Sequence, residues 1–266
     1  MIRSMIFFPG KDFYEVPEQY GLKYENVTFL TGDGVELFGW YLHAKPVVKP
    51  VFADGDKAVL LYFHGNAGNI SGRLSKARGW TERGVPVFLM DYRGYGQSQG
   101  EIRHQDDILK DAEAAVCLLK EKKGIPQSGI ILYGESLGSY PAVRLACENS
   151  FRAVVLEAPY TSFTALSEKH YGMLPGFMRE SLLRNFTFPN EDWIGKLRTP
   201  LFILHGTRDD VCPYDMGETL FMRAPDPKGF FPVPEGAHND LPMKAGEAYW
   251  DKPCEFIKKL PPQAAH

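Results

Sequence analysis

Residues 130–139 constrain the fold of this chain most, because they read as a buried strand, a turn that carries a serine, and the start of a helix. A Gly-x-Ser-x-Gly turn between a strand and a helix is the context that a nucleophile elbow requires. The turn strains the backbone at Ser136, and Gly134 and Gly138 leave room where strand and helix pack closely. Most serines in such a five-residue pattern only cap helices, but the flanking strand and helix favour a reactive Ser136.

Strands and helices alternate on both sides of this turn. An Asp-Gly turn within residues 31–34, between alternating runs at 27–30 and 35–42, predicts a β-hairpin. Continuous apolar runs and amphipathic stretches then follow one another. The expected strands lie at 58–63, 85–90, 130–133, 153–156, 201–204 and 229–233, and the expected helices at 71–83, 106–123, 140–147, 214–223 and 241–260. This order predicts an α/β fold with a mostly parallel eight-stranded sheet, an antiparallel N-terminal hairpin and helices on both faces.

The chain shows neither an internal repeat nor a linker, so we expect one domain over residues 1–266. With 266 residues and 44% hydrophobic content it can bury a single large core. The alternation stalls over residues 160–198, which predicts a small lid-like insertion within that domain. A net charge of -3 gives no reason to expect nucleic acid as a partner. The oligomeric state does not follow from these patterns.

Other patterns argue against cofactors, metals and membrane spans. The four cysteines form no Cys-x-x-Cys pair, and no metal-ligand or nucleotide-loop spacing is present. We therefore expect no cofactor and no metal. The apolar start of the chain breaks at Pro9-Gly10 and is too short for a signal peptide or a spanning helix. A soluble, cytoplasmic protein is expected, although a chain trimmed of an upstream anchor would have the same sequence.

A serine nucleophile requires a histidine base, and catalytic groups in parallel sheets gather at the carboxyl ends of strands. Among seven histidines, His238 is the best candidate, because it follows the last predicted strand in a loop with two small residues before it. His64 and His205 each end a buried strand and precede a glycine, which favours a role in the turn.

The acid that orients the base is expected at the end of the strand at 201–204. Asp209 is the preferred candidate, because the turn after Gly206 brings it back towards the strand end. The alternatives are Asp210, which is also placed to cap the next helix, then Asp215, and Glu157 at the end of the preceding strand.

An oxyanion hole requires two backbone N–H groups. One is expected from Leu137, at the N-terminus of the helix after the elbow. The other is expected from the loop at residues 64–69, where the amide of Asn66 is favoured and that of Ala67 is the alternative.

Seven motifs spread along nearly the whole chain carry a family resemblance: Phe7-Phe8-Pro9 and residues 33–40, 64–69, 91–98, 134–138, 205–209 and 236–240. With these motifs the chain resembles α/β-hydrolase-fold serine hydrolases, most closely the Bem46-like group that includes the ABHD13 and ABHD17 type proteins. The resemblance implies that Ser136, Asp209 and His238 are nucleophile, acid and base. Relatives often have glycine at the position of Ala237, and many carry an N-terminal membrane anchor, which is not expected for this chain.

The insertion at 160–198 contains the residues most relevant to substrate binding. In this architecture such an insertion lies over the nucleophile, and its apolar residues either line the site or pack on the domain. The candidates for an apolar substrate wall are Tyr160, Phe163, Tyr171, Met173, Leu174 and Phe177. Because the insertion is short, we expect an open site with modest selectivity.

Together these residues predict a serine hydrolase that cleaves small or medium carboxylic esters through an acyl-enzyme. Alternatives on the same triad are an acyl-protein thioesterase, as among the ABHD17 type relatives, and an amidase or peptidase. The substrate would be a small molecule or an acyl group. An alternative of another class is a non-catalytic ligand-binding or scaffold protein, since fold alone does not establish activity.

Overall fold

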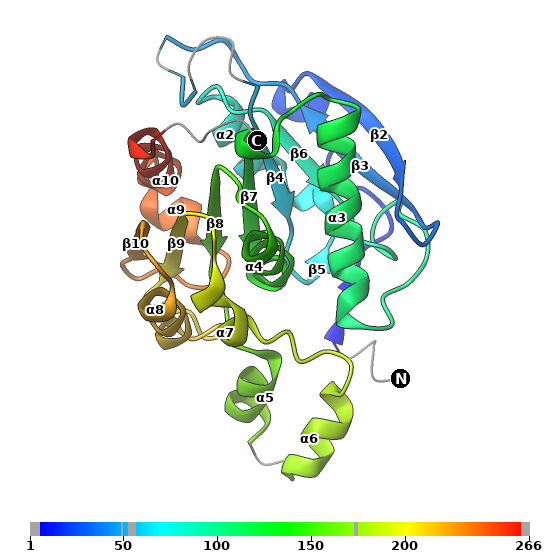
Figure 1. Ribbon diagram of the computed structural model, residues 1–266, viewed down its shortest axis with the longest axis vertical. Coiled ribbons are helices and arrows are strands. Elements are labelled where there is room, and N and C mark those ends of the chain that lie inside the picture. Colours follow the sequence, from blue (N-terminus) through cyan, green and yellow to red (C-terminus); the bar gives the residue numbers. More distant parts are fainter. Residues whose placement is uncertain (1–5, 49, 53–56, 173–174, 262–266) are drawn as a thin grey trace.

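A single sheet forms the centre of the protein (Figure 1). The structure is a computed structural model that describes residues 6–48, 50–52, 57–172 and 175–261. Within these residues the sheet has eight strands in the order β10-β9-β8-β7-β4-β6-β3-β2. The strands are β2 (Tyr24–Leu30), β3 (Glu36–Leu42), β4 (Val59–Phe63), β6 (Val87–Met90), β7 (Ile130–Glu135), β8 (Ala153–Glu157), β9 (Leu201–Gly206) and β10 (Lys228–Val233).

The antiparallel part of the sheet is the predicted N-terminal hairpin. Strands β2 and β3 pair with Leu30 opposite Glu36, and β3 pairs antiparallel with β6. The remaining neighbours, from β6 through β4 and β7 to β10, are all parallel. The predicted α/β-hydrolase fold is therefore confirmed, and the carboxyl ends of the parallel strands meet at one edge of the sheet.

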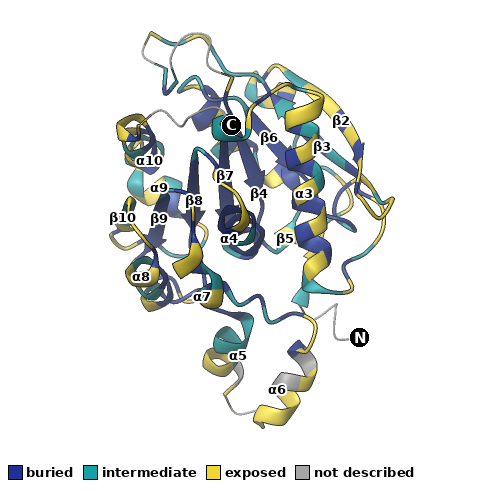
Figure 2. Ribbon diagram, in the orientation of Figure 1, coloured by how far each residue is buried: buried dark blue, intermediate teal, exposed yellow. Residues whose placement is uncertain are grey.

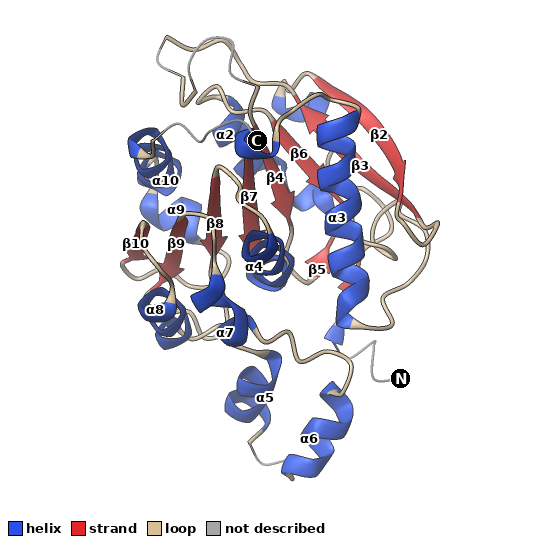
Figure 3. Cartoon of the chain, in the orientation of Figure 1, coloured by secondary structure: helices blue, strands red, loops and turns tan. Residues whose placement is uncertain are grey.

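Helices cover both faces of the sheet (Figure 3). Residues of α3, α4 and α8 pack on one face with Leu61, and residues of α2 and α10 pack on the other with Leu60. Strands β4, β7, β8 and β9 are buried along their whole length, because both faces are covered (Figure 2). The bounds are α2 (Leu74–Thr81), α3 (Gln105–Glu121), α4 (Ser139–Glu148), α8 (Tyr214–Arg223) and α10 (Ala248–Lys259).

Two segments differ from the sequence prediction. The last helix, expected over residues 241–260, is divided into α9 (Leu241–Ala245) and α10, because Gly246 adopts a positive φ of 55° that ends α9. Near the N-terminus an unpredicted strand, β1 (Phe8–Pro9), pairs in parallel with β5 (Ala67–Gly68). This pair ties the start of the chain to the loop at 64–69.

The described part of the insertion at residues 160–198 contains the α-helices α5 (Phe163–Tyr171), α6 (Gly176–Leu183) and α7 (Asn190–Trp193) and a short 3₁₀ helix at Ile194–Lys196. Helices α5 and α6 project beyond the carboxyl edge of the sheet (Figure 1), and α6 is largely exposed (Figure 2). None of the helices among the described residues combines the length and apolarity needed to cross a membrane.

Candidate active site

The elbow has the strained geometry that its sequence predicts. Ser136 lies directly after β7 and has a positive φ of 49°, a conformation that L-residues with a Cβ rarely adopt. A side chain at Gly134 would collide with the carbonyl of Gly138, and one at Gly138 would collide with the carbonyl of Phe63. Glycine is therefore required on both sides of the serine, because strand β7, helix α4 and strand β4 approach closely there.

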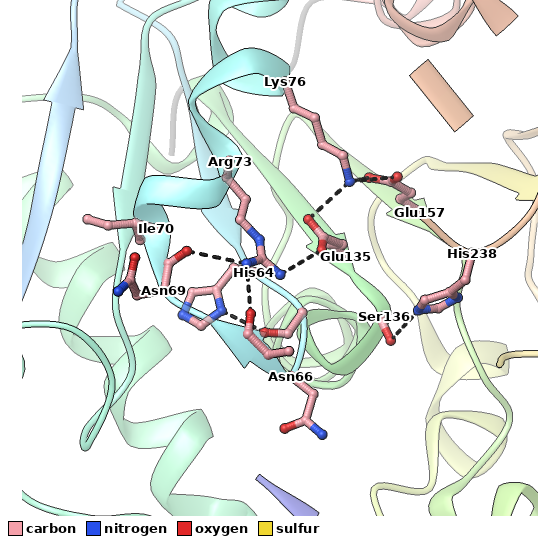
Figure 4. Close-up of polar contacts among 12 residues, drawn as sticks. His64, Asn66, Asn69, Ile70, Arg73, Lys76, Glu135, Ser136, Glu157 and His238 are labelled. Atoms are coloured by element: carbon pink, nitrogen blue, oxygen red, sulfur yellow. Dashed lines mark hydrogen bonds and ion pairs between the residues drawn. The ribbon is translucent and has the colours of Figure 1, made fainter. Parts of the chain in front are cut away.

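Three side chains from separate strand ends meet at this edge. The Oγ of Ser136 lies 3.2 Å from Nε2 of His238, and Nδ1 of His238 lies 2.7 Å from Oδ2 of Asp209. Figure 4 shows the imidazole of His238 facing Ser136. The serine follows β7, the aspartate follows β9 and the histidine follows β10, so the parallel sheet itself brings them together.

Asp209 is held as a carboxylate. Its Oδ1 accepts hydrogen bonds from the amides of Val211 (2.9 Å) and Cys212 (2.8 Å). Burial raises the pKa of Asp209, but hydrogen bonds from His205 and His238 outweigh burial and lower that pKa from 3.8 to about 2. Nε2 of the buried His205 lies 3.4 Å from Oδ2 of Asp209 and 2.7 Å from the carbonyl of Cys212. His205 therefore stabilises the turn that presents the acid.

The alternative acids lie elsewhere. Asp210 is exposed and does not cap α8, whose N-cap residue is Pro213, and Asp215 forms an exposed ion pair with Lys169. Glu157 is buried and contacts Lys76 at 2.9 Å (Figure 4). Of the four carboxylates considered from the sequence, the structure places Asp209 beside His238.

The loop at residues 64–69 lies across the pocket from His238. Asn66 lines the pocket beside Ser136, and its carbonyl accepts a hydrogen bond from the hydroxyl of Tyr95 at 2.8 Å. Leu137 is the residue after the nucleophile and lies in a short 3₁₀ turn before α4. Ala67 belongs to β5. Asn66 and Leu137, the two favoured amide donors, thus come from different segments of the chain.

These groups open into a pocket of about 410 Å³. Its polar part contains Ser136, His238, Asn66 and Asn239, and its apolar part is contributed mainly by the insertion and the N-terminal segment. The apolar lining residues are Ile6, Phe8, Phe163, Leu166, Leu183 and Val211. The pocket thus combines an apolar lining with a few polar groups beside the serine, a composition typical of small-molecule sites.

Of the six residues predicted for the substrate wall, one lines the pocket and two do not. Phe163 lines the pocket. Tyr160 is completely buried and packs against Phe163 instead, and Phe177 is 74% exposed on α6 and does not line the pocket. Hydrophobicity alone does not indicate the direction of a side chain, so it could not separate Phe163 from Tyr160 and Phe177. Met173, Leu174 and the side chain of Tyr171 lie outside what the structure describes.

Two contributions to the pocket were not expected. Ile6 and Phe8 reach it through the pairing of β1 with β5, and Sγ of Cys212 lies 3.9 Å from Oγ of Ser136. The position of Cys212, three residues after Asp209, could have suggested its proximity to the serine. A two-residue strand has no periodicity, so the placement of Phe8 had no comparable signal.

A second pocket, of about 740 Å³, lies at the opposite ends of the strands. It is lined by residues that precede β7, β8 and β9, including Gln127, Ser150 and Arg198. Neither Ser136 nor His238 borders it. The smaller pocket is therefore the candidate active site.

Comparison with known proteins shows the family to which the chain belongs. The family model Hydrolase_4, described as serine aminopeptidase S33, matches residues 54–191. Alpha/beta hydrolase domain-containing protein 17B of Homo sapiens is 35% identical over 205 residues, which cover 76% of this chain and 67% of that protein. Alpha/beta hydrolase domain-containing protein WAV2 of Arabidopsis thaliana is 30% identical over 272 residues, which cover 96% of this chain and 86% of that protein.

The esterase Pf2001 of Pyrococcus furiosus has a similar structure. Its TM-score is 0.74 at 18% sequence identity, and the match covers 95% of this chain and 98% of that one. This similarity supports the fold, and the sequence relatives confirm the resemblance that the motifs predicted. The chain therefore belongs to the α/β-hydrolases, in the family of the Hydrolase_4 model.

Proposed function

We propose that this protein is a serine hydrolase that cleaves carboxylic esters through an acyl-enzyme. One observation carries the proposal: Oγ of Ser136, at a strained elbow, lies 3.2 Å from Nε2 of His238, which is itself bonded to Asp209. Nucleophile, base and orienting acid within hydrogen-bonding reach are the signature of activated serine nucleophiles.

In the first half-reaction, Oγ of Ser136 attacks the ester carbonyl carbon while Nε2 of His238 takes the hydroxyl proton. The carbonyl oxygen becomes an oxyanion, which the amides of Leu137 and Asn66 are proposed to bind. The C–O bond to the alcohol then breaks, and His238 gives its proton to the leaving oxygen. Asp209 remains ionised throughout and stabilises the imidazolium, in agreement with its lowered pKa.

In the second half-reaction, water attacks the acyl carbon and His238 takes a proton from it. The tetrahedral intermediate breaks at the bond to Oγ, the proton returns to Ser136, and the carboxylic acid leaves. The pocket beside the serine would hold the acyl chain against Phe163 and Leu166 of α5.

The pocket favours ester over aminopeptidase chemistry, despite the description of the family model. An aminopeptidase must bind a free α-ammonium group, and an unpaired carboxylate is the usual partner for such a cation. Glu135 is the only acidic residue among the described residues that line the pocket, and it already binds Arg73, Lys76 and Tyr62.

A matched set of butyryl substrates tests this proposal: a p-nitrophenyl ester, a thioester and a p-nitroanilide. We expect saturable hydrolysis of the ester, a kcat/KM for the anilide at least 100-fold lower, and no activity above background for Ser136→Ala. A preference for the thioester would assign the site to thioester substrates. Absence of turnover with all three would contradict an enzyme of this class and favour a binding protein.

A further inference from the structure

The two proposed oxyanion amides come from segments about seventy residues apart, and their spacing must be fixed. Asn66 belongs to the loop at 64–69, called the oxyanion loop below, and Leu137 follows the nucleophile. A displacement of about 1 Å in such a constellation costs on the order of 100-fold in rate. A structural device that holds the loop against the elbow would therefore contribute directly to catalysis, provided that the proposed function is correct.

One side chain bridges the two segments. Nη1 of Arg73 donates hydrogen bonds to the carbonyls of Ala67 (2.8 Å) and Asn69 (3.3 Å) in the oxyanion loop. Its Nη2 donates to Oε1 of Glu135 at 2.9 Å, shown in Figure 4. Ala67 directly follows Asn66, and Glu135 directly precedes Ser136. The guanidinium therefore binds Ala67, the residue after the proposed oxyanion donor Asn66, and Glu135, the residue before the nucleophile.

The elbow end of this bridge is itself fixed. Oε2 of Glu135 accepts a hydrogen bond from the hydroxyl of Tyr62 at 2.5 Å and lies 3.3 Å from Nζ of Lys76. The oxyanion loop packs directly on this carboxylate, because a Cβ at Gly65 would lie only 2.8 Å from Oε1. Glu135 is thus in contact with the loop as well as bonded to the cation that holds it.

The charges within this cluster balance. Arg73 and Lys76 face Glu135 and Glu157, two cations against two anions. Burial opposes ionisation of Glu135, but the two cations hold its pKa well below the ordinary value. Paired charges with satisfied hydrogen bonds resist displacement, because separating them inside the protein is costly. The cluster is therefore a rigid support directly behind the nucleophile.

We propose that Arg73 is a positioning residue that sets the distance between the oxyanion loop and the nucleophile elbow. This role requires a planar group with several donors, since one side of the guanidinium binds the loop and the other binds Glu135. A lysine keeps the charge but has a single ammonium group, so it does not hold both segments in one geometry.

Arg73→Lys tests this role, and Arg93→Lys is its matched control. Arg93 is a buried arginine whose guanidinium joins separate segments through Asp111 at 2.8 Å and Asp33 at 3.0 Å, and these contacts involve neither Ser136 nor the oxyanion loop. We expect kcat for an ester to fall about 10- to 100-fold in Arg73→Lys with KM within threefold. Arg93→Lys should lower the melting temperature and leave kcat within threefold of wild type.

A second readout separates positioning from stability. An alkylboronic acid forms a tetrahedral adduct with the serine, so its affinity reports the oxyanion geometry, and it should weaken in Arg73→Lys by the same factor as kcat/KM. Rates are divided by the concentration of active sites, measured by complete covalent labelling of the serine. Unfolded molecules in a preparation then do not count as lost activity.

The role would be overturned by a folded Arg73→Lys variant with kcat and boronate affinity within threefold of wild type, or by an equal loss of kcat in Arg93→Lys. If Arg73→Lys does not fold, Glu135→Gln at the other end of the bridge is judged by the same criteria. Inactivity of the wild-type protein would instead contradict the proposed function, so the two failures are distinguishable.

Discussion

The carboxyl edge of the sheet and the insertion at 160–198 both face the pocket, but they are built differently. The sheet edge places Ser136 and Asp209 after the buried strands β7 and β9, and His238 after the edge strand β10. The insertion contributes Phe163 from a short helix, while Phe177 on the next helix is 74% exposed. The proposed chemistry, which requires positions accurate to better than about 1 Å, would thus lie on the rigid sheet edge, and the proposed apolar contact with the substrate on the more variable insertion.

The insertion is nevertheless anchored to the sheet edge. Nε2 of His170 lies 2.8 Å from the carbonyl of Val211, and Nζ of Lys169 lies 3.3 Å from Asp215. Both contacts join α5 to the segment that follows the acid, Asp209. They are exposed, and exposed pairs of this kind contribute about 0.5 kcal/mol each. The comparison therefore predicts large effects at the strand ends and small ones in the insertion.

The largest effect is expected for Ser136→Ala. Loss of a serine nucleophile lowers kcat by roughly 10⁵- to 10⁶-fold in comparable triads. Ser167 lines the same pocket from α5, and Ser167→Ala should stay within about threefold. Steady-state ester hydrolysis measures both. A similar loss in the two variants would show that the insertion, too, carries chemistry.

The next effect is expected at the acid. Asp209→Asn leaves the geometry largely intact but presents the wrong hydrogen-bonding group to His238, so kcat should fall by about 10³- to 10⁴-fold. The neighbouring exposed Asp210→Asn should stay within threefold. The reverse pattern, with Asp210 sensitive and Asp209 silent, would contradict the assignment of the acid.

A smaller effect concerns stability against acid. The pKa of Asp209 is about 2 in the folded protein, against an ordinary value of 3.8 that applies to the unfolded chain. Between these pH values the unfolded chain therefore binds more protons at this residue. The ionised Asp209 therefore contributes stability above pH 4, about 2 kcal/mol, which is lost as pH falls towards 2.

Urea unfolding of wild type and Asp209→Asn at pH 5 and pH 3 measures this contribution. The advantage of wild type should shrink by about 1 kcal/mol over that range. Asp215→Asn, which removes only the exposed pair with Lys169, should shift stability by no more than about 0.5 kcal/mol. An acid sensitivity unchanged in Asp209→Asn would argue against an ionised, hydrogen-bonded Asp209.

The smallest effect is a change in selectivity. Phe163→Ala removes part of the apolar wall and should lower kcat/KM for an octanoate ester about 5- to 10-fold relative to the acetate ester. Phe177→Ala should leave that ratio unchanged, because its side chain is exposed and does not line the pocket. Equal effects at the two positions would indicate that α6 closes over the substrate.

Most of the fold could be predicted from local patterns. Asp33-Gly34 marked the hairpin, and continuous apolar runs marked the buried strands β4 and β7. These signals are reliable because burial on both faces demands apolar residues at every position. The break at Gly246 was missed because a helical pattern continues on both sides of it, although a glycine there was an available signal.

The candidate site likewise has a part that could be predicted from the sequence and a part that could not. Ser136, Asp209 and His238 could be chosen because a parallel sheet brings its strand ends to one edge, whatever the loops do. The residues of the apolar substrate wall could not be chosen in this way. Tyr160 and Phe163 are both aromatic and lie three positions apart, but only Phe163 lines the pocket. The role of Arg73 also had no sequence signal, because it depends on contacts with Glu135 across 62 positions.

Covalent labelling of the folded protein with a fluorophosphonate tests the central claim most directly. Such probes react with serines activated by a neighbouring base, and intact-mass and peptide analysis locate the adduct. We predict one phosphonyl group per chain, located on Ser136, absent in Ser136→Ala and formed far more slowly in His238→Ala. A folded wild-type protein that forms no adduct, or one labelled at another residue, would contradict the account.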